Sequence, residues 1–110
     1  MIRPIFDRVV MATDLSPAWD QIVGCGGELR KLGCFGVILA YVITPNFFGG
    51  PGESPPPAAS RLAAQRRVLS DQGLEVIIET PIGLPGRSLN GVAQKYGAPL
   101  IIIGSHGKSR

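Results

Sequence analysis

The segment Val9-Val10-Met11-Ala12-Thr13-Asp14-Leu15-Ser16-Pro17 decides the fold class, because a strand ends and a helix begins within it. Its first four residues are apolar and close a predicted strand over residues 5–12. Ser16 is a residue type favoured at a helix N-cap, and Pro17 suits the first helical position, where a missing backbone N–H costs nothing. The segment therefore predicts a strand followed by a helix that reaches about residue 32.

The rest of the chain repeats this alternation of strand and helix signals. Strands are predicted over residues 37–43, 74–80 and 100–104, and helices over residues 58–72 and 88–96. Residues 37–43 are apolar on both faces, which is typical of a central parallel strand, whereas residues 74–80 alternate with polar ones and predict an edge strand. Alternating elements with short connections predict a doubly wound α/β domain, with a parallel sheet between two helical layers.

The spacing of apolar residues predicts which face of the first two helices is buried. In the first, Ile22, Cys25, Leu29 and Leu32 follow one another at spacings of three or four, so we expect them to form one buried stripe. Cys25 is then a packing residue. In the helix over residues 58–72, Leu62 and Leu69 are expected to point inward, and the three arginines, Arg61, Arg66 and Arg67, to lie in solvent.

Composition excludes several classes of protein. The 110 residues suit one small domain, and the 45% hydrophobic and 17% charged content argues against a disordered chain. The net charge of +3 comes without a long Lys/Arg run, so no nucleic-acid partner is predicted. No apolar stretch approaches the ~18 residues of a membrane helix, and Asp7 and Arg8 interrupt any signal-peptide pattern, so a cytoplasmic location is expected.

The two cysteines match no zinc or redox spacing. Cys25 and Cys34 are nine positions apart, and we expect both to stay reduced. Cys34 stands at a helix–strand junction, where a reactive thiol is a remote alternative to simple packing.

Ligands of a doubly wound sheet bind beyond the carboxyl ends of its strands, where the strand order reverses. Residues 13–16, 43–46, 81–86 and 104–110 are expected at this edge. Asp14 follows the first strand directly, so it either accepts hydrogen bonds from a ribose hydroxyl or base amine, or caps the next helix beside Ser16. Val42 and Ile43 end the second strand with free backbone groups.

The last predicted strand runs into Gly104-Ser105-His106-Gly107-Lys108-Ser109. Its glycines let backbone N–H groups approach a phosphate, and its serines and lysine add donors and positive charge. A flexible polar tail is the alternative. His106 has no paired carboxylate or serine elbow, so a phosphate contact or a turn is favoured over general-base catalysis.

Aromatic residues leave further alternatives open. Trp19, in the first turn of the first helix, either shields a ligand or packs against the rim of the site. Phe47 and Phe48 lie in a Pro/Gly-rich loop over residues 44–57, and they fold over a ligand, meet a partner or tuck under the loop.

Four segments together resemble the universal stress protein family: VVMATDLS (9–16), VILAYV (37–42), IGLP (82–85) and IIIGSHGKS (101–109). The resemblance runs in register over essentially the whole chain, and the last segment is the most specific. It implies a three-layer fold around a five-stranded parallel sheet, usually in a dimer. It also implies binding of ATP or another adenine nucleotide, with or without Mg²⁺, and little or no hydrolysis.

The same resemblance implies the residues of the nucleotide site. Asp14 would contact the ribose or the base, Val42 would meet adenine through its backbone, and Gly83 would lie in the wall near the ligand. The other implied residues are Ala12 and Thr13 beside the adenosine, and Ile103, Gly104, His106, Gly107 and Lys108 against the ribose and phosphates. The resemblance implies no catalytic residue and no metal ligand. If Mg²⁺ were held near the phosphates, Asp14 is the one carboxylate suited to hold it.

The chain departs from the family at its carboxyl end. The family's motif is similar to G-x2-G-x9-G-[ST], and Gly104 and Gly107 supply its first half, whereas the chain ends at Arg110. We therefore expect a single domain, residues 1–110, that is incomplete at its C-terminus, with four strands present and the family's fifth missing. Weaker ATP binding is expected, and the open edge of the strand over residues 100–104 predicts a homodimer or larger assembly.

Three functions compete at this point. The first is a stress-response regulatory protein that binds ATP or a related adenine nucleotide at the carboxyl edge of the sheet. The second is an interaction module of the same fold that acts by dimerisation without a nucleotide. The third is a slow ATPase, since the fold by itself does not determine function.

Overall fold

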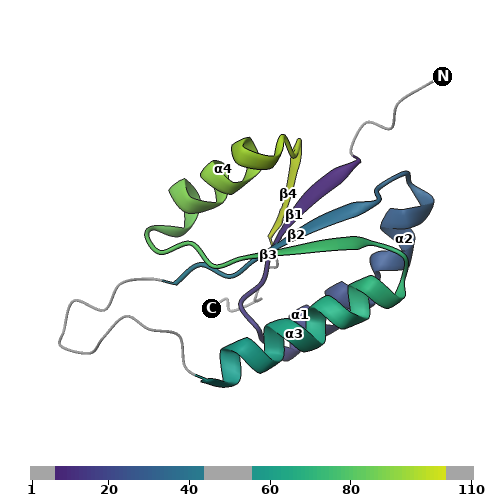
Figure 1. The fold of residues 1–110 in the computed structure, drawn as a ribbon, viewed down its shortest axis with the longest axis horizontal. Coiled ribbons are helices and arrows are strands. Elements are labelled where there is room, and N and C mark those ends of the chain that lie inside the picture. The colour runs from purple at the N-terminus through teal and green to yellow at the C-terminus, as the bar shows by residue number, and fades with distance from the viewer. Residues whose placement is uncertain (1–6, 44–55, 104–110) are drawn as a thin grey trace, which may run out of the picture.

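Four parallel strands form one sheet in the order β3–β2–β1–β4 (Figure 1). The structure is a computed structural model that describes residues 7–43 and 56–103. Along the chain the elements are β1 (Arg8–Ala12), α1 (Pro17–Gly24), α2 (Gly26–Lys31), β2 (Gly36–Ala40), α3 (Pro56–Asp71), β3 (Glu75–Glu79), α4 (Pro85–Tyr96) and β4 (Leu100–Ile103).

β1 lies inside the sheet and pairs on both sides. Its last residue, Ala12, is opposite Ala40 of β2 and Ile103 of β4. From β1 the chain steps outward to β2 and β3, and then returns across the sheet to place β4 on the other side of β1. The strand order therefore reverses beside β1, and the carboxyl ends of all four strands meet at one edge.

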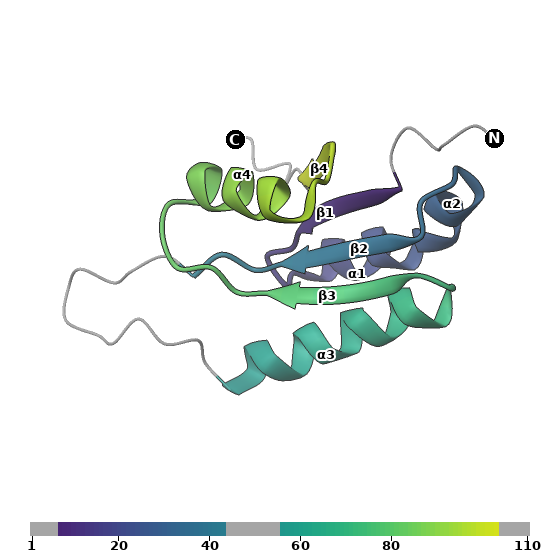
Figure 2. The same ribbon diagram turned by 45° about the horizontal axis from the view of Figure 1, so that its top comes forward.

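Helices cover both faces of the sheet. α1, α2 and α3 lie on one face and α4 lies on the other (Figure 2). Successive residues of β1 alternate between the two cores, because side chains of a strand point to opposite faces. Val9 and Met11 pack in the core beneath α1 and α3, whereas Val10 packs in the core beneath α4. The predicted doubly wound α/β architecture is confirmed.

Strands β2 and β3 behave as their sequences predict. β2 is buried at every position, as expected of a central strand, and β3 is an edge strand with exposed and half-buried residues. The second strand ends at Ala40 and not at Ile43, although Ile43 still forms an isolated bridge with Ile82. α4 begins at Pro85, three residues earlier than predicted, because a proline again occupies the first helical turn.

The prediction of one continuous first helix is wrong. The helix breaks at Cys25, whose φ of −93° and ψ of 13° separate α1 from α2. Glycines before and after this residue weaken the helix. Trp19 and Val23 are buried, and Ile22 and Leu29 of the predicted stripe pack against the same core. Cys25 and Leu32 of that stripe are exposed, so Cys25 is not the packing residue that was predicted.

A residue without a side chain is required at Gly26, at the start of α2. It is buried, and a Cβ atom added to it would lie 2.9 Å from Leu74 Cδ1 and 2.9 Å from Gln72 Nε2. Real Cβ atoms essentially never approach other atoms so closely. Gly26 therefore permits α2 to approach the end of α3.

A polar cluster fastens α4 to the edge of the sheet. The Tyr96 hydroxyl donates a hydrogen bond to Glu79 Oε2, and Lys95 Nζ lies 3.0 Å from the same oxygen. The Tyr96 hydrogen bond, followed by that of Lys95, lowers the pKa of the Glu79 carboxyl below its ordinary value. Ionised Glu79 therefore stabilises the docking of α4.

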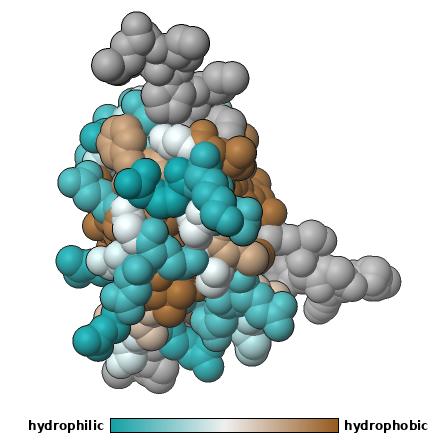
Figure 3. All heavy atoms as spheres, turned by 90° about the vertical axis from the view of Figure 1, so that its right-hand side faces the viewer, coloured by the Kyte–Doolittle hydropathy of each residue, from teal (hydrophilic) through white to brown (hydrophobic). Residues whose placement is uncertain are grey.

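Hydrophilic side chains cover most of the face in Figure 3, and hydrophobic ones gather along its right-hand margin. Within residues 7–43 and 56–103, no helix combines the length and the apolar character needed to cross a membrane.

Leu69 offers a direct test of the core beneath α3. Its side chain is fully buried, so Leu69→Ala should lower the free energy of unfolding by about 2–5 kcal/mol through lost burial and a residual cavity. The neighbouring Val68 is 41% exposed, so Val68→Ala should change it by less than about 1 kcal/mol. Urea unfolding measures both, and equal losses would contradict the assigned helix face.

The Glu79 cluster predicts a pH-dependent contribution to stability. Because the folded pKa lies below the unfolded one, this contribution is present above the unfolded pKa and is lost as the pH falls through the folded pKa. Glu79→Gln should therefore lower the urea midpoint at pH 7, and its deficit against wild type should shrink in acid. Tyr96→Phe should show the same trend. A deficit independent of pH would refute the assignment.

Candidate functional site

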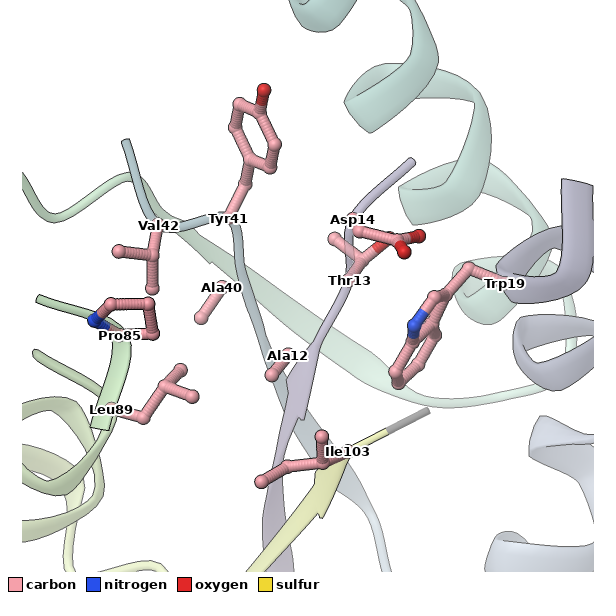
Figure 4. A pocket seen from close by; sticks show the side chains of 10 residues that line it. All are labelled: Ala12, Thr13, Asp14, Trp19, Ala40, Tyr41, Val42, Pro85, Leu89 and Ile103. Atoms are coloured by element: carbon pink, nitrogen blue, oxygen red, sulfur yellow. The ribbon is translucent and has the colours of Figure 1, made fainter. Parts of the chain in front are cut away.

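A cavity of about 350 Å³ opens where the strand order reverses, at the carboxyl edge of the sheet. Its walls come from the ends of β1, β2 and β4, from the start of α4 and from one residue of α1 (Figure 4). The lining residues are Ala12, Thr13, Asp14, Trp19, Ala40, Tyr41, Val42, Pro85, Leu89 and Ile103.

Small side chains at the strand ends leave this space open. Ala12 and Ala40 are register partners on adjacent strands, and both pack on the α4 side of the sheet. In Figure 4 they point toward Pro85 and Leu89, the first turns of α4. Any larger residue at either position would project into the gap. The result is an apolar slot between the end of the sheet and the start of α4.

Val42 presents backbone groups at the mouth of this slot. The N–H groups of its neighbours, Tyr41 and Ile43, donate to Glu79 O at 2.9 Å and to Pro81 O at 2.8 Å, on the β3 side. Backbone groups of successive residues in an extended segment face opposite sides, so those of Val42 face the β1 side. No hydrogen bond joins the Val42 backbone to another residue in the described part of the chain.

Asp14 lies in a sharp turn between β1 and α1. Leu15 has a φ of 65°, and it is the one residue other than glycine with a positive φ in the described ranges 7–43 and 56–103. Such a conformation costs a bulky residue on the order of 1–3 kcal/mol. The turn lets Asp14 line the cavity while its Oδ1 accepts the Ser16 N–H at 2.9 Å. Asp14 therefore holds the turn before α1, but no side-chain hydrogen bond caps the helix itself, so the capping alternative is not confirmed.

Ser16 occupies the N-cap position of α1 but does not cap it with its side chain. Its φ of −78° and ψ of 163° are extended, as expected of an N-cap, and Pro17 follows at the first helical position. The Ser16 Oγ is buried and makes no hydrogen bond within the described residues. The Asp14 carboxylate thus supplies the side-chain acceptor of this turn.

A buried polar pair behind the turn was not foreseen from the sequence. Thr13 is 4% exposed and Gln65 of α3 is 2% exposed, and the Thr13 hydroxyl donates to Gln65 Oε1 at 2.9 Å. Gln65 lies between Leu62 and Leu69 on the inward face of α3. A polar residue on an otherwise apolar stripe was the available signal, because a buried amide needs partners.

Burial distinguishes between the alternatives left open for Trp19 and Cys34. Trp19 is 2% exposed and packs in the core beneath α1 and α3, and it also borders the cavity. Cys34 is fully buried, and its thiol donates to the Gly36 carbonyl, with 3.2 Å between Sγ and O. Burial is the largest cause that raises the pKa of the Cys34 thiol, so a reactive thiolate is not supported there.

The sequence model of the universal stress protein family matches residues 5–110. The chain belongs to this family. Its fold is shared by a protein of Mycobacterium tuberculosis H37Rv, Rv1636, with 20% identity and a TM-score of 0.72 over 100% of this chain and 78% of that one.

Two solved structures of universal stress proteins also share the fold. A universal stress protein in complex with cAMP has 20% identity and a TM-score of 0.71, covering 96% of this chain and 77% of that one. One from Archaeoglobus fulgidus has 19% identity and a TM-score of 0.71, covering 99% and 80%. At such identities the likeness establishes the fold. A comparison with curated proteins found no match.

The structure brings together five of the residues that the sequence analysis predicts for a nucleotide site. Ala12, Thr13, Asp14, Val42 and Ile103 all line the cavity. The residues of the predicted phosphate loop, Gly104, His106, Gly107 and Lys108, lie outside the described residues, as do Phe47 and Phe48. Ala40, Tyr41 and Leu89 also line the cavity and were not predicted there, whereas Pro85 was expected only as part of the segment 81–86.

Gly83 lies beside the cavity and not in its lining. It has a φ of 148°, which favours glycine, and its N–H donates to Ile43 O at 3.0 Å. It thereby holds the connection between β3 and α4 against the end of β2, which places Pro85 at the slot. As for metals, no group of three or more His, Cys, Asp or Glu side chains is placed to hold an ion in the part of the chain that the structure describes.

Proposed function

We propose that this protein is a stress-response regulator that binds ATP or a related adenine nucleotide in the cavity at the carboxyl edge of the sheet. The observation that carries the proposal is the cavity itself, an apolar slot bordered by the Asp14 carboxylate at the point where the strand order reverses. Ligands of doubly wound sheets bind at such points.

The slot has the chemistry of a nucleoside site. Ala12 and Ala40 on one side and Pro85 and Leu89 on the other can sandwich a flat apolar base. The Val42 N–H and carbonyl face the slot without a partner among the described residues, and an adenine edge offers both an acceptor and a donor to such a pair. Asp14 can accept hydrogen bonds from ribose hydroxyls. The volume of about 350 Å³ suits a small molecule.

Family membership supports the same ligand class. A family structure of similar fold holds cAMP, which carries adenine, ribose and phosphate. Gly104, His106, Gly107 and Lys108 follow β4, and in this proposal they contact the phosphates beside Ile103. ATP is the proposed physiological ligand, and Mg²⁺ would accompany its phosphates rather than occupy a protein site.

Two substitutions test the proposed site. Ala12→Leu should abolish nucleotide binding, because the added side chain fills the slot. Asp14→Asn should raise Kd by about 10–100-fold, because it removes the charged acceptor but keeps the oxygen that accepts the Ser16 N–H. Calorimetric titration with ATP, ADP, AMP and cAMP, with and without Mg²⁺, measures both. Trp19, the one tryptophan, offers a fluorescence signal at the same cavity.

Asp71→Asn is the matched control for Asp14→Asn. It removes the same charge at the exposed end of α3, away from the lining residues, so it should leave Kd unchanged. Absence of binding by the wild-type protein at millimolar concentrations of all four nucleotides would reject the proposal.

A second candidate function, self-association without a nucleotide, is favoured by the exposed edge of the sheet. β4 pairs only with β1 among the described strands, and its Leu100 and Ile103 are 40% and 68% exposed. Edge strands of this kind pair readily with other chains. Native mass spectrometry distinguishes the candidates: a nucleotide-bound species supports the first, and a ligand-free dimer that binds no added nucleotide supports the second.

A further inference from the structure

We propose that Gln65 and Arg61 of α3 are positioning residues for the Asp14 turn, so that α3 sets the affinity of a site it does not touch. The proposal rests on the proposed function, because it assigns these residues a role in nucleotide binding. Neither residue lines the cavity.

The turn needs support from outside its own sequence. Leu15 holds a left-handed conformation, with a φ of 65°, that residues with side chains adopt only when their surroundings enforce it. The Leu15 side chain is 7% exposed and packs in the core beneath α1 and α3. Asp14 precedes this residue directly. Any relaxation of Leu15 would therefore reorient the peptide that carries Asp14.

Both polar groups of the Leu15 backbone are held from α3. Arg61 reaches the turn directly, and its Nη1 donates to Leu15 O at 2.6 Å. Gln65 acts through Thr13: the Leu15 N–H donates to Thr13 Oγ1 at 3.0 Å, and that hydroxyl donates to Gln65 Oε1 at 2.9 Å. One helix thus fixes the N–H and the carbonyl of the strained residue.

The direction of each hydrogen bond is determined by this arrangement. Thr13 has one hydroxyl proton, which goes to Gln65 Oε1, and this orients an oxygen lone pair toward the Leu15 N–H. Gln65 is oriented in turn, because its Nε2 donates to Asp20 Oδ1 of α1 at 3.1 Å. Both Thr13 and Gln65 are buried, so water cannot replace a lost partner without opening the turn.

The first experiment compares Gln65 of α3 with Gln72, the residue directly after the end of this helix. Gln65→Met keeps the side-chain length but removes both hydrogen bonds, and it should raise Kd for ATP and cAMP about tenfold. The control is Gln72→Met. Like Gln65, Gln72 makes hydrogen bonds across the helix layer, but its partners are backbone groups: its side chain accepts from Gly27 N at 2.8 Å and donates to Val23 O at 2.7 Å. It lies away from the Asp14 turn. This control should lower thermal stability and leave Kd unchanged.

A second pair of variants guards against simple unfolding. Arg61→Met changes an exposed side chain that the fold tolerates, and it should also raise Kd several-fold. Gln65→Glu places a carboxylate against Asp20, so binding should be weak at neutral pH. It should recover toward wild type near pH 5, where the two carboxyls can share a proton. Asp20 of α1 is the charged group that contacts Gln65, while Asp14 and Arg61 bind the backbone of the neighbouring turn at Ser16 and Leu15.

Amide hydrogen exchange at Leu15 gives a readout that needs no nucleotide. Exchange at this N–H should accelerate at least about tenfold in Gln65→Met and stay unchanged in Gln72→Met. With a wild-type protein that binds nucleotide, equal Kd values for wild type and Gln65→Met, or equal effects of the two Met variants on Kd, would overturn the positioning role alone. A wild-type protein that binds none of the nucleotides overturns the proposed function, and the positioning role with it.

Discussion

The pairing of β1 with a neighbour on each side is the constraint on which the rest of the molecule depends. Because β2 and β4 flank it in parallel, the right-handed crossovers that lead to the two sides of β1 lie on opposite faces of the sheet, and helices come to cover both. The same pairing brings Ala12, Ala40 and Ile103 to one level at the carboxyl edge. Strand register and two alanines therefore account for the apolar part of the cavity.

The strained turn after β1 adds the polar half of the site. Asp14 lines the cavity just beyond the end of β1, and the residue that follows it, Leu15, holds a left-handed conformation. Strain of this kind persists where the surrounding structure enforces it, and here α3 supplies the enforcing hydrogen bonds. Rigid packing on one face of the sheet thus determines the geometry of a pocket that opens toward the other.

Local patterns were enough to predict the layers but not the details of long-range contact. Apolar runs identified β2 as central and β3 as an edge, and the segments around Ala12, Val42 and Ile103 pointed to one edge of the sheet. The apolar periodicity continues across Cys25 and does not reveal the break there, because the need for Gly26 comes from a distant contact, the approach of α2 to the end of α3. The Thr13–Gln65 hydrogen bond was missed because its partners lie 52 residues apart.

The two hydrophobic cores differ in size, and this difference bears on how the molecule opens. The core beneath α1 and α3 joins eleven buried residues among those described, and the core beneath α4 joins five. A cooperative unit held by the smaller core separates at lower free energy than the whole fold. α4 is therefore the element expected to detach first during native-state fluctuations, and because Pro85 and Leu89 form one wall of the slot, such an opening offers an entry route for a ligand without global unfolding.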